Sequence, residues 1–112
     1  MKKVIATSEA PKAVGPYSQA IEVNGTLYIS GQIPVNPADG TVQEEITAAA
    51  HQSLKNIGAI LREAGMTYDN VVKTVNEVYA EYFTGDKPAR ACYQAAALPL
   101  GVKVEIEAIA VR

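Results

Sequence analysis

An Asn-Gly pair constrains this chain more than any other feature. Asn24 and Gly25 stand between two runs rich in β-branched and aromatic residues, and both tolerate the positive φ angles of a two-residue hairpin turn. We therefore predict a β-hairpin over residues 20–30. The next run, 31–40, contains two prolines and has glycine at both ends, which predicts an ordered loop rather than a central strand.

Two further stretches are clearly periodic. Apolar and small residues recur at helical spacing, and Thr41 with Glu44 three residues later forms a candidate capping box. We predict a helix over residues 42–64, which Gly65 can end in a left-handed conformation. Residues 102–110 alternate instead, as in a strand. The apolar face of this predicted strand holds Val102, Val104, Ile106, Ala108 and Ala110, and the other face holds Lys103, Glu105, Glu107 and Ile109.

The stretch between these two elements admits two interpretations. Residues 71–74 read as a strand, and a helix then begins with no turn signal between them. A continuous helix is the alternative, because Val71, Val75, Val78 and Tyr82 are spaced by four, three and four residues. Three of these are β-branched valines, which weakens the helix.

The order of the predicted elements indicates the fold class. A hairpin, a helix, a short strand, a second helix and two strands predict a single α+β domain over residues 1–112, with two helices packed on one face of the sheet. A domain of this size has difficulty burying its apolar surface alone, so self-association is expected.

Composition excludes several function classes. The net charge of −2 and the pI near 5.3 lack the basic footprint of a nucleic-acid-binding protein. No stretch approaches the roughly 20 apolar residues that a membrane span requires, so we expect a cytoplasmic protein. One cysteine and one histidine are too few for a protein-only zinc site, and no phosphate-binding glycine motif is present. We therefore expect no structural metal.

An arginine and the only cysteine stand two residues apart in "KPARACYQAAALP" (87–99). In a strand, Arg90 and Cys92 share a face, about 7 Å apart. An arginine held among alanines suits a carboxylate, which it can bind through two parallel hydrogen bonds. The alternative is an edge-strand arginine paired with a surface glutamate. For Cys92 we favour a small buried thiol over a nucleophile, because nothing places His51 beside it.

Four other residues are candidates for a site. Glu105, with Glu107 on the same strand face, could hold and activate a water; the alternative is a solvated sheet face. Tyr17 follows a Gly-Pro turn that could present its phenol to a pocket; the alternative is a core aromatic residue. Ser30 ends a predicted strand beside Gly31, whose missing side chain would let a ligand approach the backbone. A routine strand end is the alternative.

Four motifs in order resemble one family along nearly the whole chain. They are "GPYSQAI" (15–21), "SGQIPVNP" (30–37), "KPARACYQAAALP" (87–99) and "VEIEAIAVR" (104–112). Together they resemble the reactive intermediate deaminase family, RidA, formerly YjgF.

This resemblance implies a fold, an assembly and an activity. It implies a chorismate-mutase-like α+β fold of the bacillus type, with a mixed sheet, that assembles into a homotrimer with a central barrel and pockets in the clefts between subunits. It implies hydrolysis of 2-aminoacrylate-type enamines and 2-imino acids to 2-keto acids and ammonia, without a cofactor. Arg90 would bind the substrate carboxylate and Glu105 would position the attacking water. The remaining substrate-binding positions would be Tyr17, Ser30, Gly31, Cys92 and Asn76.

One departure from the family pattern concerns the middle of the chain. Relatives continue "VVKT" with roughly a dozen more residues, whereas Thr74 here joins Val75 directly, which makes the assignment of Asn76 the least secure. A segment absent from the printed sequence, an engineered deletion and a natural variant would each explain this. We favour the first, because removing half a central strand would leave backbone groups unpaired.

Two other function classes remain open. One is a non-catalytic trimer that binds small carboxylates in the same clefts as a regulatory protein. The other is an RNA-acting translation inhibitor, which the acidic pI and the lack of a basic, aromatic stripe disfavour.

Overall fold

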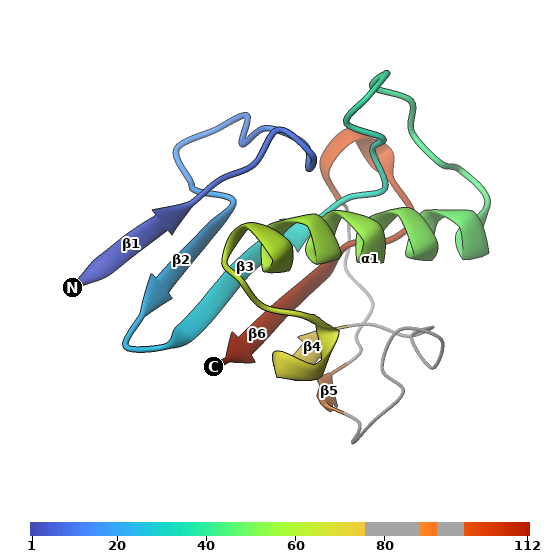
Figure 1. The fold of residues 1–112 in the computed structure, drawn as a ribbon. Helices are drawn as coiled ribbons and strands as arrows, with labels where there is room; N and C mark the ends of the chain where they lie inside the picture. Colours follow the sequence, from blue (N-terminus) through green and yellow to red (C-terminus); the bar gives the residue numbers. More distant parts are fainter. Residues whose placement is uncertain (76–87, 92–97) are drawn as a thin grey trace.

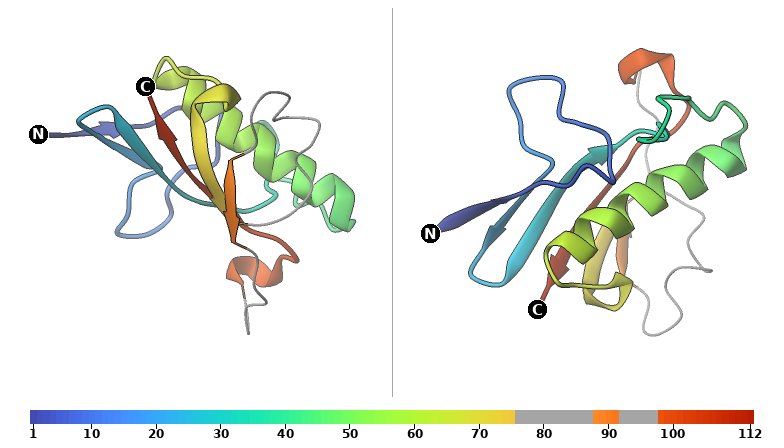
Figure 2. Two further views of the ribbon diagram at one scale, coloured as in Figure 1. Left: turned by 90° about the horizontal axis from the view of Figure 1, so that it is seen from below. Right: turned by 45° about the horizontal axis from the view of Figure 1, so that its top comes forward.

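The computed structural model describes residues 1–75, 88–91 and 98–112. They form one mixed sheet of six strands in the order β1-β2-β3-β6-β4-β5, crossed on one face by the helix α1 (Figures 1 and 2). The α+β class is therefore confirmed. The predicted second helix lies outside the described residues.

The predicted hairpin is confirmed. β2 (Ala20–Val23) and β3 (Thr26–Gln32) are antiparallel, and the turn residues Asn24 and Gly25 have φ angles of 49° and 81°. The strand β3 continues to Gln32, two residues further than predicted, before the proline-containing loop begins. An edge strand that the sequence analysis missed, β1 (Lys2–Ile5), pairs antiparallel with β2.

The helix α1 (Ile46–Glu63) is shorter at its start than predicted. The capping box at Thr41 was wrong, because the helix begins only at Ile46 and the amide of Thr41 donates to Asp39, as its hydroxyl also does. Glu45 caps the helix instead, and its carboxylate accepts a hydrogen bond from the Ala48 amide at 2.8 Å. The predicted end is confirmed, since Gly65 follows with a φ of 74°.

The remaining strands form the other half of the sheet. A 3-10 turn, η1 (Tyr68–Asn70), leads into β4 (Val71–Val75), so residues 71–75 are a strand and not part of a continuous helix. The strand β4 pairs antiparallel with β6 (Ile106–Val111) and parallel with β5 (Ala89–Ala91). The strand β6 begins at Ile106 rather than at 102, and the 3-10 turn η2 (Pro99–Gly101), with left-handed φ angles at Leu100 and Gly101, precedes residues 102–105.

The two faces of the sheet differ in what covers them. α1 packs mainly on β3 and β6, where its buried Leu54, Ile57 and Leu61 belong to the same core as Leu27 and Ile106. The alternation predicted for 102–110 is confirmed by burial, because the even-numbered residues are buried and the odd-numbered ones are more exposed. Among the described residues no helix covers the opposite face, which we call the open face.

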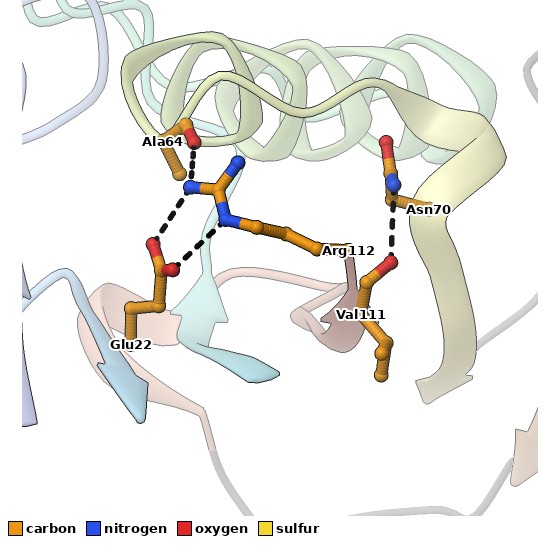
Figure 3. Close-up of polar contacts among 5 residues, drawn as sticks. All are labelled: Glu22, Ala64, Asn70, Val111 and Arg112. Carbon is orange, nitrogen blue, oxygen red and sulfur yellow. Dashed lines mark hydrogen bonds and ion pairs between the residues drawn. The ribbon is translucent and has the colours of Figure 1, made fainter. Parts of the chain in front are cut away.

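A polar clamp joins the C-terminus to the rest of the fold (Figure 3). The guanidinium of Arg112 donates two hydrogen bonds of 3.0 Å to the carboxylate of Glu22 on β2, and a third to the carbonyl of Ala64 at the end of α1. Asn70 donates a hydrogen bond of 3.0 Å to the carbonyl of Val111. The last two residues thus tie together β2, α1 and the approach to β4.

Candidate active site

A bulge in β3 brings Gly31 against Glu105. The register between β3 and β6 shifts between Ile29 and Gln32, so Ser30 and Gly31 lie in an irregular segment at the start of β6. A Cβ atom placed on Gly31 would lie 2.6 Å from Cδ of Glu105 and would overlap its carboxyl group. The glycine was predicted to admit a ligand, but here its missing side chain makes room for the Glu105 carboxyl group.

The environment of Glu105 favours its protonated form. Burial raises the pKa of the Glu105 carboxyl above its ordinary value, and the negative charge of Glu107 raises it further. Glu105 is half-buried, whereas Glu107 is exposed. The prediction of a partly buried acid on this strand face is therefore confirmed for Glu105 alone. Such a carboxyl group exchanges a proton more readily near neutral pH than a solvated one.

Ser30 and Tyr17 belong to the same end of the sheet. The hydroxyl of Ser30 donates a hydrogen bond of 2.6 Å to the carbonyl of Ser18, and the Ser30 amide donates one of 2.9 Å to the carbonyl of Gln19. These bonds hold β3 against the loop that carries Tyr17. The Tyr17 side chain is 52% exposed, so it is not the core aromatic residue of the alternative interpretation.

Arg90 lies on a strand that is not adjacent to Glu105. It is on β5, two strands away from β6, a separation of roughly 10 Å. Its register partner is Thr74, which in turn pairs with Ala108, and both are buried on the α1 side of the sheet. Side chains of paired residues point to the same face of a sheet, so the Arg90 side chain leaves the backbone on the α1 side. Glu105 shares its side with Glu107, which lies on the open face. Within one chain the two residues therefore do not converge.

Two of the predicted substrate-binding residues, Asn76 and Cys92, lie outside the described residues. In the described ranges no three His, Cys, Asp or Glu side chains are grouped closely enough to hold a metal ion. The same ranges contain no helix long and apolar enough to cross a membrane.

Two features near these residues were not predicted from the sequence. One is a depression of about 180 Å³ on the open face, where Lys73, Glu107 and Tyr28 surround Ile109. The other is the buried side chain of Gln19, which binds the loop preceding it. A polar residue directly before the apolar run of β2 was the available signal for Gln19. No local pattern identified Lys73, because its neighbours there come from other strands.

Curated relatives match this chain from end to end. A protein of Mus musculus named 2-iminobutanoate/2-iminopropanoate deaminase is 51% identical over 125 residues, covering 100% of this chain and 93% of that protein. The protein of the same name from Escherichia coli strain K12 is 45% identical over 127 residues, covering 100% of this chain and 99% of that protein. Both matched stretches are longer than the 112 residues of this chain.

Solved structures match the fold as well. The Rid-family protein YyfA of Yersinia pestis superposes with a TM-score of 0.94 at 48% identity, covering 100% of both chains. Escherichia coli TdcF with bound serine superposes with a TM-score of 0.90 at 35% identity, covering 98% of each chain. The family model for Endoribonuclease L-PSP matches residues 7–112. This chain therefore belongs to the Endoribonuclease L-PSP family, to which the RidA and YjgF proteins also belong.

Proposed function

We propose that this protein is an enamine/imine deaminase that hydrolyses 2-iminobutanoate and 2-iminopropanoate to 2-keto acids and ammonia. The observation that carries the proposal is the half-buried Glu105 carboxyl group with its raised pKa, seated against Gly31. Relatives that are 45–51% identical over their matched lengths carry the name of this activity.

The reaction requires few groups, because an imine carbon is already electrophilic. Glu105 as carboxylate accepts a proton from water while the water oxygen bonds to the imine carbon and the C=N electron pair moves to nitrogen. Nitrogen takes this proton from Glu105, which gives a neutral carbinolamine. Glu105 then accepts the hydroxyl proton as the carbonyl of the 2-keto acid forms and passes it to nitrogen, which leaves as ammonia. A carboxyl group with a raised pKa can take the first proton and return it to nitrogen. The 2-aminoacrylate-type enamine enters as its imine tautomer. No cofactor takes part.

Arg90 binds the substrate carboxylate in this proposal, and it comes from a neighbouring copy. Arg90 and Glu105 lie on opposite faces of one sheet, so a shared pocket requires a second subunit. The proposed assembly is the homotrimer of the chorismate-mutase-like fold, with a central barrel and three intersubunit clefts. Tyr17, Ser30 and Gly31 would line one wall of each cleft and Arg90 the other. Cys92 and Asn76 complete the proposed set of substrate-binding residues.

A cross-strand row on the open face supports self-association. Val4, Ile21, Tyr28 and Ile109 lie opposite one another in successive strands β1, β2, β3 and β6. Val4 is 58% exposed and Tyr28 is 52% exposed in the single chain. Contiguous apolar surface of this kind is typical of a protein interface. Packing of this row against other copies would bury it.

We further propose that residues 1–112 form one domain, in which about a dozen residues present in relatives are missing after Thr74. The relative from Mus musculus matches over 125 residues, 13 more than this chain has. The bond between Thr74 and Val75 lies inside β4, where both residues pair with β5 and β6. An intact mass of 11.9 kDa for the purified protein would show that the molecule itself is short. A larger mass would show that the printed sequence lacks a segment.

The test measures ammonia and 2-keto acid release from 2-aminoacrylate generated enzymatically. We expect rapid release by the wild type, no turnover with Glu105→Gln, and a loss of kcat/KM of about 10²-fold or more with Arg90→Ala. Glu105→Gln should still bind a small 2-keto acid, whereas a non-catalytic carboxylate-binding protein would show no turnover in any form. No acceleration by the wild type, or full activity in Arg90→Ala, would refute the proposal.

Mixing the two variants tests the intersubunit site. Trimers refolded from equal amounts of Glu105→Gln and Arg90→Ala chains contain clefts in which the intact arginine and the intact glutamate meet. Random assembly of a cyclic trimer makes about a quarter of the clefts complete, so about a quarter of wild-type activity should return. If no activity returns although trimers form, the two residues do not act across a subunit boundary.

A cytoplasmic location is also part of the proposal. A relative from Arabidopsis thaliana is named a chloroplastic protein, so members of the family differ in compartment. Fractionation of cells that express the untagged protein, with immunodetection, would test the location.

A further inference from the structure

The side chain of Gln19 forms hydrogen bonds with four backbone groups of the loop that precedes it. It is 5% exposed and stands directly before β2. Its Oε1 accepts a hydrogen bond of 2.7 Å from the Thr7 amide. Its Nε2 donates to the carbonyls of Thr7 at 3.1 Å, Ala10 at 3.3 Å and Pro11 at 2.7 Å. An amide nitrogen has two hydrogens, so two of these three carbonyls share one.

These bonds connect the beginning of the loop over residues 6–19 to its end. The same loop carries Tyr17, and most of its tip, including Lys12 and Tyr17, is exposed to solvent. The main chain of the loop end is fixed to β3, because the Ser30 amide donates to the Gln19 carbonyl at 2.9 Å. The Gln19 side chain therefore holds the loop beside Ser30 and Gly31, which contact the end of the sheet where Glu105 lies.

We propose that Gln19 is a positioning residue for substrate binding, which fixes the loop of Tyr17 against the wall formed by Ser30 and Gly31. The proposal rests on the function proposed above, since it assigns Tyr17 and Ser30 to the substrate pocket. Gln19 itself touches neither Glu105 nor the reacting atoms in this role. Its effect passes through the backbone of the loop.

Only a primary amide can make this set of bonds. A glutamate at position 19 has the same shape and could accept from the Thr7 amide, but a carboxylate cannot donate to the carbonyls of Ala10 and Pro11. A methionine has similar length and neither group. Each substitution leaves buried backbone groups without partners, and the loop must open to water to satisfy them.

The rate of limited proteolysis measures how firmly Gln19 fixes the loop, without any assay of activity. Trypsin cuts after Lys12, which follows the clamped Pro11 carbonyl directly. We expect Gln19→Glu and Gln19→Met to be cut at this bond at least about tenfold faster than the wild type, with fragments identified by mass. Asn56→Asp is the matched control, because Asn56 is also a buried amide that donates to two carbonyls, those of Ile33 and Val35. It should leave cleavage after Lys12 within about twofold of the wild-type rate.

Steady-state kinetics separates positioning from a general loss of structure. With a displaced Tyr17 loop, KM should rise about tenfold while kcat changes by less than about threefold. A purely structural role would reduce the fraction of active enzyme, so kcat would fall and KM would stay constant. Unchanged cleavage and unchanged KM in both Gln19 variants would also overturn the proposal. If the wild type shows no deaminase activity, the proposed function fails, and the substrate-binding role of Gln19 fails with it. The rate of cleavage after Lys12 still reports whether Gln19 holds the loop.

A measurement on the wild type covers the case in which neither variant folds. Hydrogen exchange of the Thr7 amide, which binds Gln19 Oε1, should be slower than that of the Ala13 amide at the tip of the loop. Equal exchange rates would show that the clamp does not hold in solution, and this would overturn the proposal.

Discussion

The carboxyl group of Glu105 occupies the space that a Cβ at Gly31 would need. A Cβ there would lie 2.6 Å from Cδ of Glu105, closer than real Cβ atoms approach other atoms. Gly31 follows Ser30 in the β3 bulge, and Glu105 directly precedes β6. Gly31 in β3 thus determines where the carboxyl group of Glu105, the proposed base, can lie.

Gly31→Ala should displace this carboxyl group. We expect turnover to fall about 10²-fold and the free energy of unfolding to fall by about 1–3 kcal/mol, because the new methyl group overpacks the site. Chemical denaturation and steady-state kinetics measure the two effects.

A double-mutant cycle provides the control for this substitution. In a Glu105→Ala background the methyl group has room, so Gly31→Ala should cost much less stability there. An equal cost in both backgrounds would show that the two side chains do not compete for space.

Glu107→Gln should shift the acid limb of the kcat/KM profile to lower pH. The charge of Glu107 raises the pKa of the Glu105 carboxyl, and a general base is active only when deprotonated. Removing that charge lets Glu105 lose its proton at a lower pH. Glu63→Gln on the exposed end of α1 changes the net charge equally and should leave the limb in place. A shift of the same size in both variants would point to net charge rather than to proximity.

Glu105→Gln should make the protein more stable at neutral pH while it abolishes turnover. The pKa of Glu105 is raised in the folded state, so the folded protein binds this proton more tightly than the unfolded chain does. The resulting stability is complete below the unfolded value near 4.5 and is lost as pH rises through the folded pKa. Denaturation curves should therefore show a gain for the variant at pH 7 that shrinks as pH falls through the folded pKa of Glu105 and has disappeared below about pH 4.5. A gain that does not depend on pH would contradict this linkage.

Arg112→Ala should lower Tm, because it removes two hydrogen bonds to Glu22 and one to the Ala64 carbonyl at the end of α1. The hydrogen bond from Arg112 lowers the pKa of Glu22, so the stability that this pair contributes is present above the unfolded pKa of the carboxyl and is lost as pH falls through its folded pKa. Thermal melts of wild type and Glu22→Gln should therefore converge in acid. High salt should also reduce the difference, since the Arg112 side chain is 49% exposed to solvent.

Glu22→Gln and Arg112→Ala together test the coupling. The double variant should melt close to Arg112→Ala alone, because the glutamate has then already lost its partner. Strictly additive losses of Tm would mean that the bonds seen between Arg112 and Glu22 add nothing to stability in solution.

Local preferences along the chain determined much of the fold. Asn24 and Gly25 specified the hairpin because their own φ angles suit its turn, and Gly65 ended α1 for the same kind of reason. The alternation around Ile106 identified the buried face of β6, since period-two burial depends only on neighbouring residues. Each of these signals acts within a few residues.

Tertiary contacts decided the rest. The start of α1 is a local exception, since Glu45 caps the helix and the amide and hydroxyl of Thr41 donate hydrogen bonds to Asp39, two residues earlier. Glu105 meets Gly31, more than seventy residues earlier in the chain, only because the β3 bulge sets the register with β6. The same pairing rules put Arg90 on the α1 side of the sheet and Glu105 on the open face, so a single chain does not bring the two residues together. Residue spacing cannot show such relations, because strand order and register are properties of the assembled sheet and not of any single segment.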